Sequence, residues 1–114
     1  MSAGDISARL AADGLRAVVA TGHDGAALLI VERLRETAVE NRFVLLIIEQ
    51  SVGSLDRAML LAAIGPLAVE LAPGTRLSAI DILVGTNDAD VAAAGRFLAA
   101  ATSTTGQTLT IGPL

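Results

Sequence analysis

The chain has 114 residues, 53% of them hydrophobic and 18% charged, which is too apolar a composition for a disordered protein. A net charge of −4 without any basic cluster argues against nucleic-acid binding, and the absence of Cys excludes disulfides and thiolate chemistry. Apolar runs such as Phe43–Ile48 are far too short to span a membrane, and the N-terminus lacks the features of a signal peptide. We therefore expect a cytoplasmic protein.

The first half of the chain predicts two helices that alternate with two strands. A short amphipathic helix is expected at about residues 4–12, followed by a β-branched strand at about 15–21 and a longer helix at about 25–40. The next segment, Arg42–Ile48, is almost continuously apolar. Continuous rather than alternating hydrophobicity indicates a strand covered on both faces, as in a parallel sheet.

The second half continues the alternation. A helix at about 55–72, with Ser54 as its expected N-cap, is apolar nearly all round, which indicates burial on more than one side. A strand at Arg76–Val84, a helix at about 88–101 and a strand at 107–111 follow. The pattern predicts one α/β domain over residues 1–114, with a Rossmann-like parallel sheet of about four strands and flanking helices.

Four segments carry a resemblance to a known family. They are LAVELAP at Leu67–Pro73, RLSAI at Arg76–Ile80, FLA at Phe97–Ala99 and TGQTLTIG at Thr105–Gly112. In this order and spacing they resemble the C-terminal half of a short-chain dehydrogenase/reductase (SDR), an NAD(P)-dependent oxidoreductase. The resemblance covers about half of the chain and implies a truncated SDR-like domain.

The resemblance also shows which catalytic groups are missing. The family moves a proton through a Tyr and a Lys four residues later, with a Ser on the preceding strand. Counting back from LAVELAP places these roles at Gly53 and Arg57, and the Ser position falls at Ile47 or Ile48. Glycine has no proton to transfer, and arginine does not deprotonate. We therefore expect neither catalysis nor a bound cofactor, although Ser51 and Arg57 could bind an anion.

The expected nucleotide loop is incomplete. The family opens with TGxxxGxG, whereas this chain offers only Thr21, Gly22 and Gly25 as weak cofactor-binding candidates. A second alignment makes the first strand the family's fourth, so that the chain spans strands four to seven. The only histidine, His23, has no second ligand beside it, and no metal site is predicted.

These features support three hypotheses for function. The first is a non-catalytic SDR-like subunit, forming a homodimer or a heteromer with a full-length SDR. The second is a small-molecule binding module for an acyl or nucleotide group, and the third, least favoured, is a divergent NAD(P)-dependent reductase. In the family, the helix that carries Tyr and Lys packs against its copy in another subunit. This implies an interface at Leu55, Met59, Ala62 and Ala63.

Overall fold

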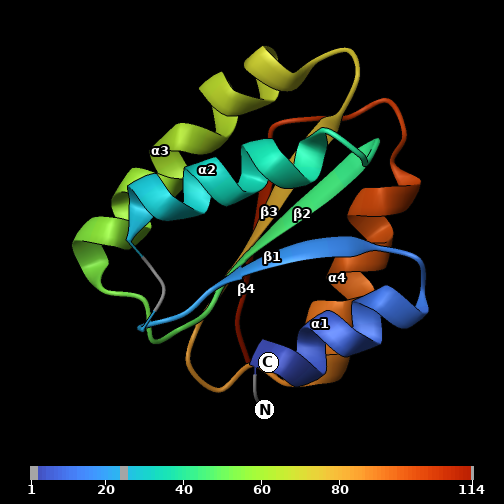
Figure 1. Ribbon diagram of the computed structural model, residues 1–114. Helices are drawn as coiled ribbons and strands as arrows, with labels where there is room; N and C mark the ends of the chain where they lie inside the picture. The colour runs from blue at the N-terminus through green and yellow to red at the C-terminus, as the bar shows by residue number, and fades with distance from the viewer. Residues whose placement is uncertain (1–2, 24–25, 114) are drawn as a thin grey trace.

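Strands and helices alternate along the chain, as the sequence pattern predicts (Figure 1). The computed structural model describes residues 3–23 and 26–113. The elements are α1 (Ala3–Ala12), β1 (Arg16–Ala20), α2 (Ala27–Ala38), β2 (Phe43–Ile48), α3 (Ser54–Leu71), β3 (Arg76–Ile82), α4 (Asp88–Ala100) and β4 (Gln107–Ile111).

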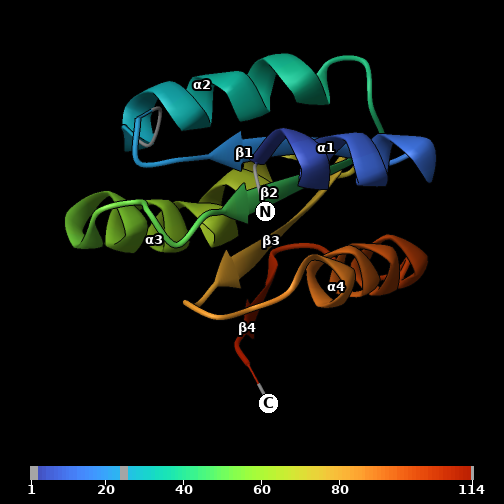
Figure 2. The ribbon, with the colours of Figure 1, turned by 90° about the horizontal axis from the view of Figure 1, so that it is seen from below.

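The four strands form one parallel sheet in the order β1-β2-β3-β4. Val18 of β1 lies opposite Leu46 of β2, and Ile47 of β2 lies opposite Ile80 of β3. The predicted α/β class and parallel sheet are therefore confirmed. Because all strands run in the same direction, their carboxyl ends meet at one edge of the sheet, as the arrows in Figure 2 show.

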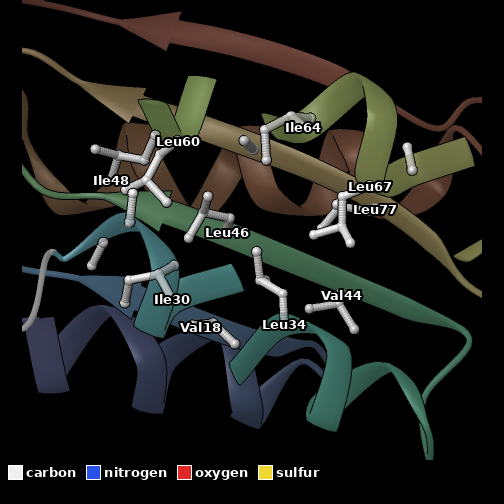
Figure 3. Packing of buried hydrophobic residues seen from close by; sticks show 14 of the residues in the cluster. Val18, Ile30, Leu34, Val44, Leu46, Ile48, Leu60, Ile64, Leu67 and Leu77 are labelled. Atoms are coloured by element: carbon white, nitrogen blue, oxygen red, sulfur yellow. The ribbon is translucent and has the colours of Figure 1, made fainter. Parts of the chain in front are cut away.

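Helices cover both faces of the sheet and create two separate cores. The face under α2 and α3 buries side chains that Figure 3 shows interdigitating: Val18, Ile30, Leu34, Val44, Leu46, Ile48, Leu60, Ile64, Leu67 and Leu77. The opposite face buries a smaller set from α1, α4 and the strands: Ile6, Leu10, Leu45, Ile47, Ile80, Ile82, Val91, Ala94 and Leu98. The central strand β2 contributes to both cores, which explains its continuous hydrophobicity.

The last crossover has the opposite hand to the two before it. Each of α2, α3 and α4 moves the chain by one strand in the same direction across the sheet. However, α2 and α3 pack on one face, whereas α4 packs on the other. The three crossovers therefore cannot all have the right-handed form found in about 98% of such connections. This change of face brings α4 beside α1 and closes the second core.

Arg76, the first residue of the RLSAI segment, fixes the carboxyl end of α4. Its guanidinium donates hydrogen bonds to the carbonyl oxygens of Ala99 at 3.0 Å and Ala101 at 3.1 Å. It also lies 4.7 Å from the centre of the Phe43 ring. A cation at this end of a helix satisfies carbonyl groups that lack an intrahelical partner and complements the helix dipole. The role of this arginine is structural.

The other segments of the resemblance also make contacts that hold the fold. Thr105 Oγ1 accepts a hydrogen bond of 2.9 Å from the Leu77 amide, and the Gly106 amide donates one of 2.6 Å to the Leu77 carbonyl. Gly106 has a φ of 76°, which favours glycine. In LAVELAP, the Glu70 carboxylate accepts two hydrogen bonds from Arg35 of α2, at 2.8 and 3.1 Å. These hydrogen bonds lower the pKa of Glu70, although solvent screens this exposed pair.

Ser78 on β3 provides a direct test of the packing. Its side chain is fully buried, and its hydroxyl has no hydrogen-bond partner among the described residues. An unpaired buried hydroxyl is destabilising. We therefore expect Ser78→Ala to leave the free energy of unfolding unchanged or to raise it by up to about 1 kcal/mol, as measured by urea unfolding.

A matched variant controls for the loss of a buried hydroxyl. Thr75 is also buried, but its Oγ1 lies 3.0 Å from the Ala38 carbonyl oxygen and 2.7 Å from that of Asn41. Thr75→Val should therefore lower the free energy of unfolding by about 1–3 kcal/mol. A loss in Ser78→Ala as large as that in Thr75→Val would contradict the prediction.

Candidate functional site

The carboxyl edge of the sheet gathers most of the predicted site residues. Thr21 and Gly22 follow β1, the segment Glu49-Gln50-Ser51 follows β2, and Arg57 lies in the first turn of α3. In open α/β sheets, ligands bind outside the carboxyl ends of the strands. The groups at this edge are therefore the ones from which a site could be built.

A chain of hydrogen bonds joins the loops after β1 and β2. The Gly22 amide donates to Ser51 Oγ at 2.8 Å, and the Ser51 hydroxyl donates to Glu49 Oε1 at 2.6 Å. A Cβ atom at position 22 would lie 2.8 Å from the Ser51 carbonyl oxygen, which is too close. Gly22 thus permits a close contact between two loops. Gly25, the third cofactor-binding candidate, lies outside the described residues.

Arg57 is bound within the protein rather than turned toward a ligand. One guanidinium nitrogen pairs with the Asp81 carboxylate near the end of β3, and the other donates to the Glu49 carbonyl at 2.7 Å. The Arg57 and Asp81 side chains are only 19% and 10% exposed. The arginine therefore ties α3 to the ends of β2 and β3. The Ser51 hydroxyl proton and two of the five Arg57 N–H groups are used within the protein.

The other positions that the resemblance implies for catalysis hold a glycine and two buried isoleucines. Gly53 is the N-cap of α3 with a φ of −62°, and Ser54 is the first helical residue, so the expected Ser54 cap is wrong. Gly53 fits there because an extended residue can precede a helix without a side-chain cap. Ile47 and Ile48 are completely buried. No hydroxyl or amine stands at the positions of the family's proton relay.

A cavity of about 270 Å³ opens at the carboxyl edge, on the face covered by α1 and α4. Its lining residues are Ile6, Glu49, Gln50, Ile82, Gly85 and Thr86. The sequence pattern does not reveal this cavity, because its walls come from α1, β3 and two loops that are distant in the chain. The one available signal is a carboxylate, Glu49, directly after a buried strand.

The predicted interface residues lie on or beside the outer surface of α3. Leu55 is 73% exposed, Met59 is 50% exposed, Ala62 is exposed and Ala63 is half-buried. Val69, about two helical turns beyond Ala62, is 76% exposed. The structure describes a single chain and therefore does not test these contacts, so the interface stays a prediction. Within the described residues, no three His, Asp or Glu side chains lie close enough to hold a metal ion.

The fold and the spacing of the four segments agree with a match to a family model. The model is described as a short chain dehydrogenase-like protein, and it matches residues 7–111, which include all four strands. The chain belongs to this family. Comparisons with curated proteins and with solved structures found no match. None of the helices in residues 3–23 and 26–113 is long and apolar enough to cross a membrane.

Membership of the SDR-like family also helps to choose between the two alignments of β1. The Rossmann sheet has the strand order 3-2-1-4-5-6, so strand 5 neighbours strand 4 and is separated from strand 1. By the resemblance, the strand that leads into LAVELAP is the family's fifth, and in this chain that strand is β2. Because β1 pairs directly with β2, its position favours the fourth strand over the first. The Thr21–Gly22 loop then does not correspond to the family's phosphate-binding turn.

Proposed function

We propose that this SDR-like protein is a non-catalytic subunit that acts by association through the outer surface of α3. The observation that carries the proposal is the exposed apolar side of this helix. Its partner is most simply a second copy of the chain, and a full-length SDR, which offers the equivalent helix, is the other partner to test. A homodimer forms from this chain alone, whereas the heteromer requires a full-length SDR as well.

The outer surface of α3 combines apolar side chains with small ones. The exposed positions recur at helical spacing and contain no charge until the last turn: Leu55, Ala58, Met59, Ala62, Gly65, Pro66 and Val69. Asp56 and Arg57 are half-buried, and Glu70 is hydrogen-bonded to Arg35. Soluble monomers rarely expose a continuous apolar patch of this kind. A charge-free surface is also compatible with its own copy across a two-fold axis.

The edge of the sheet supports the same proposal. β1 pairs with β2 on one side only, and no other strand of the described residues pairs with its outer side. The helix α1 contacts β1 and packs with α4 on one face of the sheet, and it adds no strand to this edge. An open edge strand is normally protected or paired. A partner that covers β1 would complete the sheet.

The groups at the carboxyl edge support the proposal that the protein is not catalytic. We expect the purified protein to show no turnover of any substrate with NAD or NADP, because Gly53 and Arg57 replace the proton relay. We also expect no shift in melting temperature with millimolar dinucleotide, since ligand binding to the native state would raise it. Turnover above a no-protein control, or a clear melting shift, would contradict the proposal.

Light scattering on the protein alone, and after co-expression with a full-length SDR, tests the association itself. A dimer of the isolated chain supports the self-associating form. A chain that becomes soluble only with the SDR supports the heteromer. A stable monomer at micromolar concentration, unchanged by co-expression, would refute both forms.

A binding module is the second candidate function, and the cavity beside Glu49 is the observation that favours it.

A further inference from the structure

The cavity at the carboxyl edge holds one carboxylate in a fixed position. The Glu49 amide donates to the Ala20 carbonyl at 2.9 Å, and the Glu49 carbonyl accepts from Arg57 at 2.7 Å. Its side-chain Oε1 accepts from Ser51 at 2.6 Å, and Oε2 accepts no hydrogen bond from the described residues. Glu49 is half-buried. The residue is thus held at three points, and one carboxylate oxygen is available to a ligand.

Gln50 and Thr86 are the other polar side chains of the lining. The exposed Gln50 amide can donate or accept, whereas Thr86 presents an acceptor. Thr86 Oγ1 lies 2.7 Å from the Leu83 carbonyl oxygen and 2.9 Å from that of Ile111. A hydroxyl has one proton, and both carbonyls are acceptors, so the proton of Thr86 is used within the protein. Toward the cavity, the Thr86 oxygen can only accept. Glu49 and Thr86 therefore both require a hydrogen-bond donor.

The charges around the cavity favour a ligand whose hydrogen-bond donor is cationic. None of the lining residues is basic, and the nearest arginine in the network, Arg57, is paired with Asp81. The first turn of α4, which follows the Thr86 loop, carries Asp88 and Asp90. A phosphate or carboxylate ligand would meet repulsion here, whereas an ammonium group would be attracted and could donate up to three hydrogen bonds.

The rest of the lining sets the size and polarity of the ligand. Ile6 and Ile82 supply an apolar surface beside the two acceptors, and Gly85 adds no side chain. The volume of about 270 Å³ is at the small end for ligand pockets. A short aliphatic chain can lie on the isoleucines while its charged end reaches Glu49.

We propose that this cavity binds a small aliphatic primary amine, whose ammonium group pairs with Glu49 Oε2 and donates to Thr86 Oγ1. The site is built from α1, β3 and the loops after β2 and β3, and none of its lining residues lies on α3. The proposal is therefore independent of association through that helix, and either can fail without the other.

A series of three probes of similar length tests the proposal on the unaltered protein. Amide chemical shifts are followed by NMR during titration at neutral pH with n-butylammonium, butan-1-ol and butyrate. Saturable shifts at Gln50, Gly85 and Thr86 are expected with butylammonium, with an affinity at least about tenfold higher than for butan-1-ol, because a charge-assisted hydrogen bond is lost in the alcohol. Butyrate should not bind. Equal binding of the alcohol, or binding of butyrate, would overturn the proposal.

A variant pair tests the role of the carboxylate. Glu49→Gln keeps an acceptor for Ser51 but removes the charge, and it should weaken butylammonium binding at least about tenfold. Glu40→Gln removes an exposed carboxylate from the turn between α2 and β2 and should leave the affinity unchanged. Unchanged affinity in Glu49→Gln, or shifts located away from the cavity, would refute the assignment. The probe series decides the matter if Glu49→Gln does not fold.

Discussion

Replacing Arg57 with methionine is expected to lower the free energy of unfolding by about 3 kcal/mol. The substitution leaves the Asp81 carboxylate, which is only 10% exposed, without its cation. It also removes the donor that the Glu49 carbonyl uses at 2.7 Å. Breaking one partner of a buried ion pair typically costs 3–5 kcal/mol, and partial exposure places this pair at the lower end. Urea unfolding at neutral pH measures the effect.

Two further variants separate loss of the pair from loss of a charge. The double variant Arg57→Met/Asp81→Leu removes both charges and should recover much of the stability, because an apolar pair can replace a buried ion pair. Arg33→Met changes an exposed arginine of α2 and should alter stability by no more than about 0.5 kcal/mol. A double variant less stable than Arg57→Met, or an Arg57→Met variant as stable as Arg33→Met, would contradict this role.

The order and type of the elements could be predicted because hydrophobic periodicity reports local geometry. Phe43–Ile48 is apolar at every position since both faces of β2 are covered. The change of face between α3 and α4 could not be predicted in this way. Periodicity shows that Val91 and Leu98 share one side of a helix, but it does not say against which face of the sheet that side packs.

The candidate site was only partly predictable, for a similar reason. Counting from LAVELAP places Gly53 and Arg57 at the start of α3, where the structure also has them. The partner of Arg57 is Asp81, which lies 24 residues away and meets it only when β3 packs beside β2. The Glu49–Thr86 cavity likewise depends on the meeting of two loops. Spacing along a sequence carries no information on contacts of this kind.

The residues of the SDR-like segments make contacts that join different elements of the fold. Arg76 fixes the end of α4, Thr105 and Gly106 join the start of β4 to Leu77, and Glu70 joins α3 to α2. Each is used by the fold itself. These residues therefore have a structural use in the sheet that does not depend on whether a proton is transferred.

Introducing a charge on the outer surface of α3 is the second change with a large expected effect. We expect Met59→Glu to weaken self-association by at least about 30-fold, converting the dimer into monomers at micromolar concentration. Met59 is 50% exposed in the single chain, so glutamate can be hydrated in the monomer without disturbing the core. In a two-fold dimer the substitution introduces two carboxylates into one apolar contact. About 1–3 kcal/mol for each buried polar group, with tenfold in affinity for every 1.4 kcal/mol, gives the expected loss.

A matched pair of glutamate substitutions, at one exposed alanine of α3 and one of α4, shows whether the dimer contact lies on α3. Ala62 of α3 and Ala93 of α4 are both exposed helical alanines, so replacing each with glutamate adds the same charge in a similar setting. Ala62→Glu should dissociate the dimer, whereas Ala93→Glu should leave its mass unchanged in light scattering and sedimentation. Both variants should keep the melting temperature that the monomer has by itself. A dimer that survives both Met59→Glu and Ala62→Glu would exclude the α3 surface, and dissociation by Ala93→Glu alone would place the contact on the face of α4.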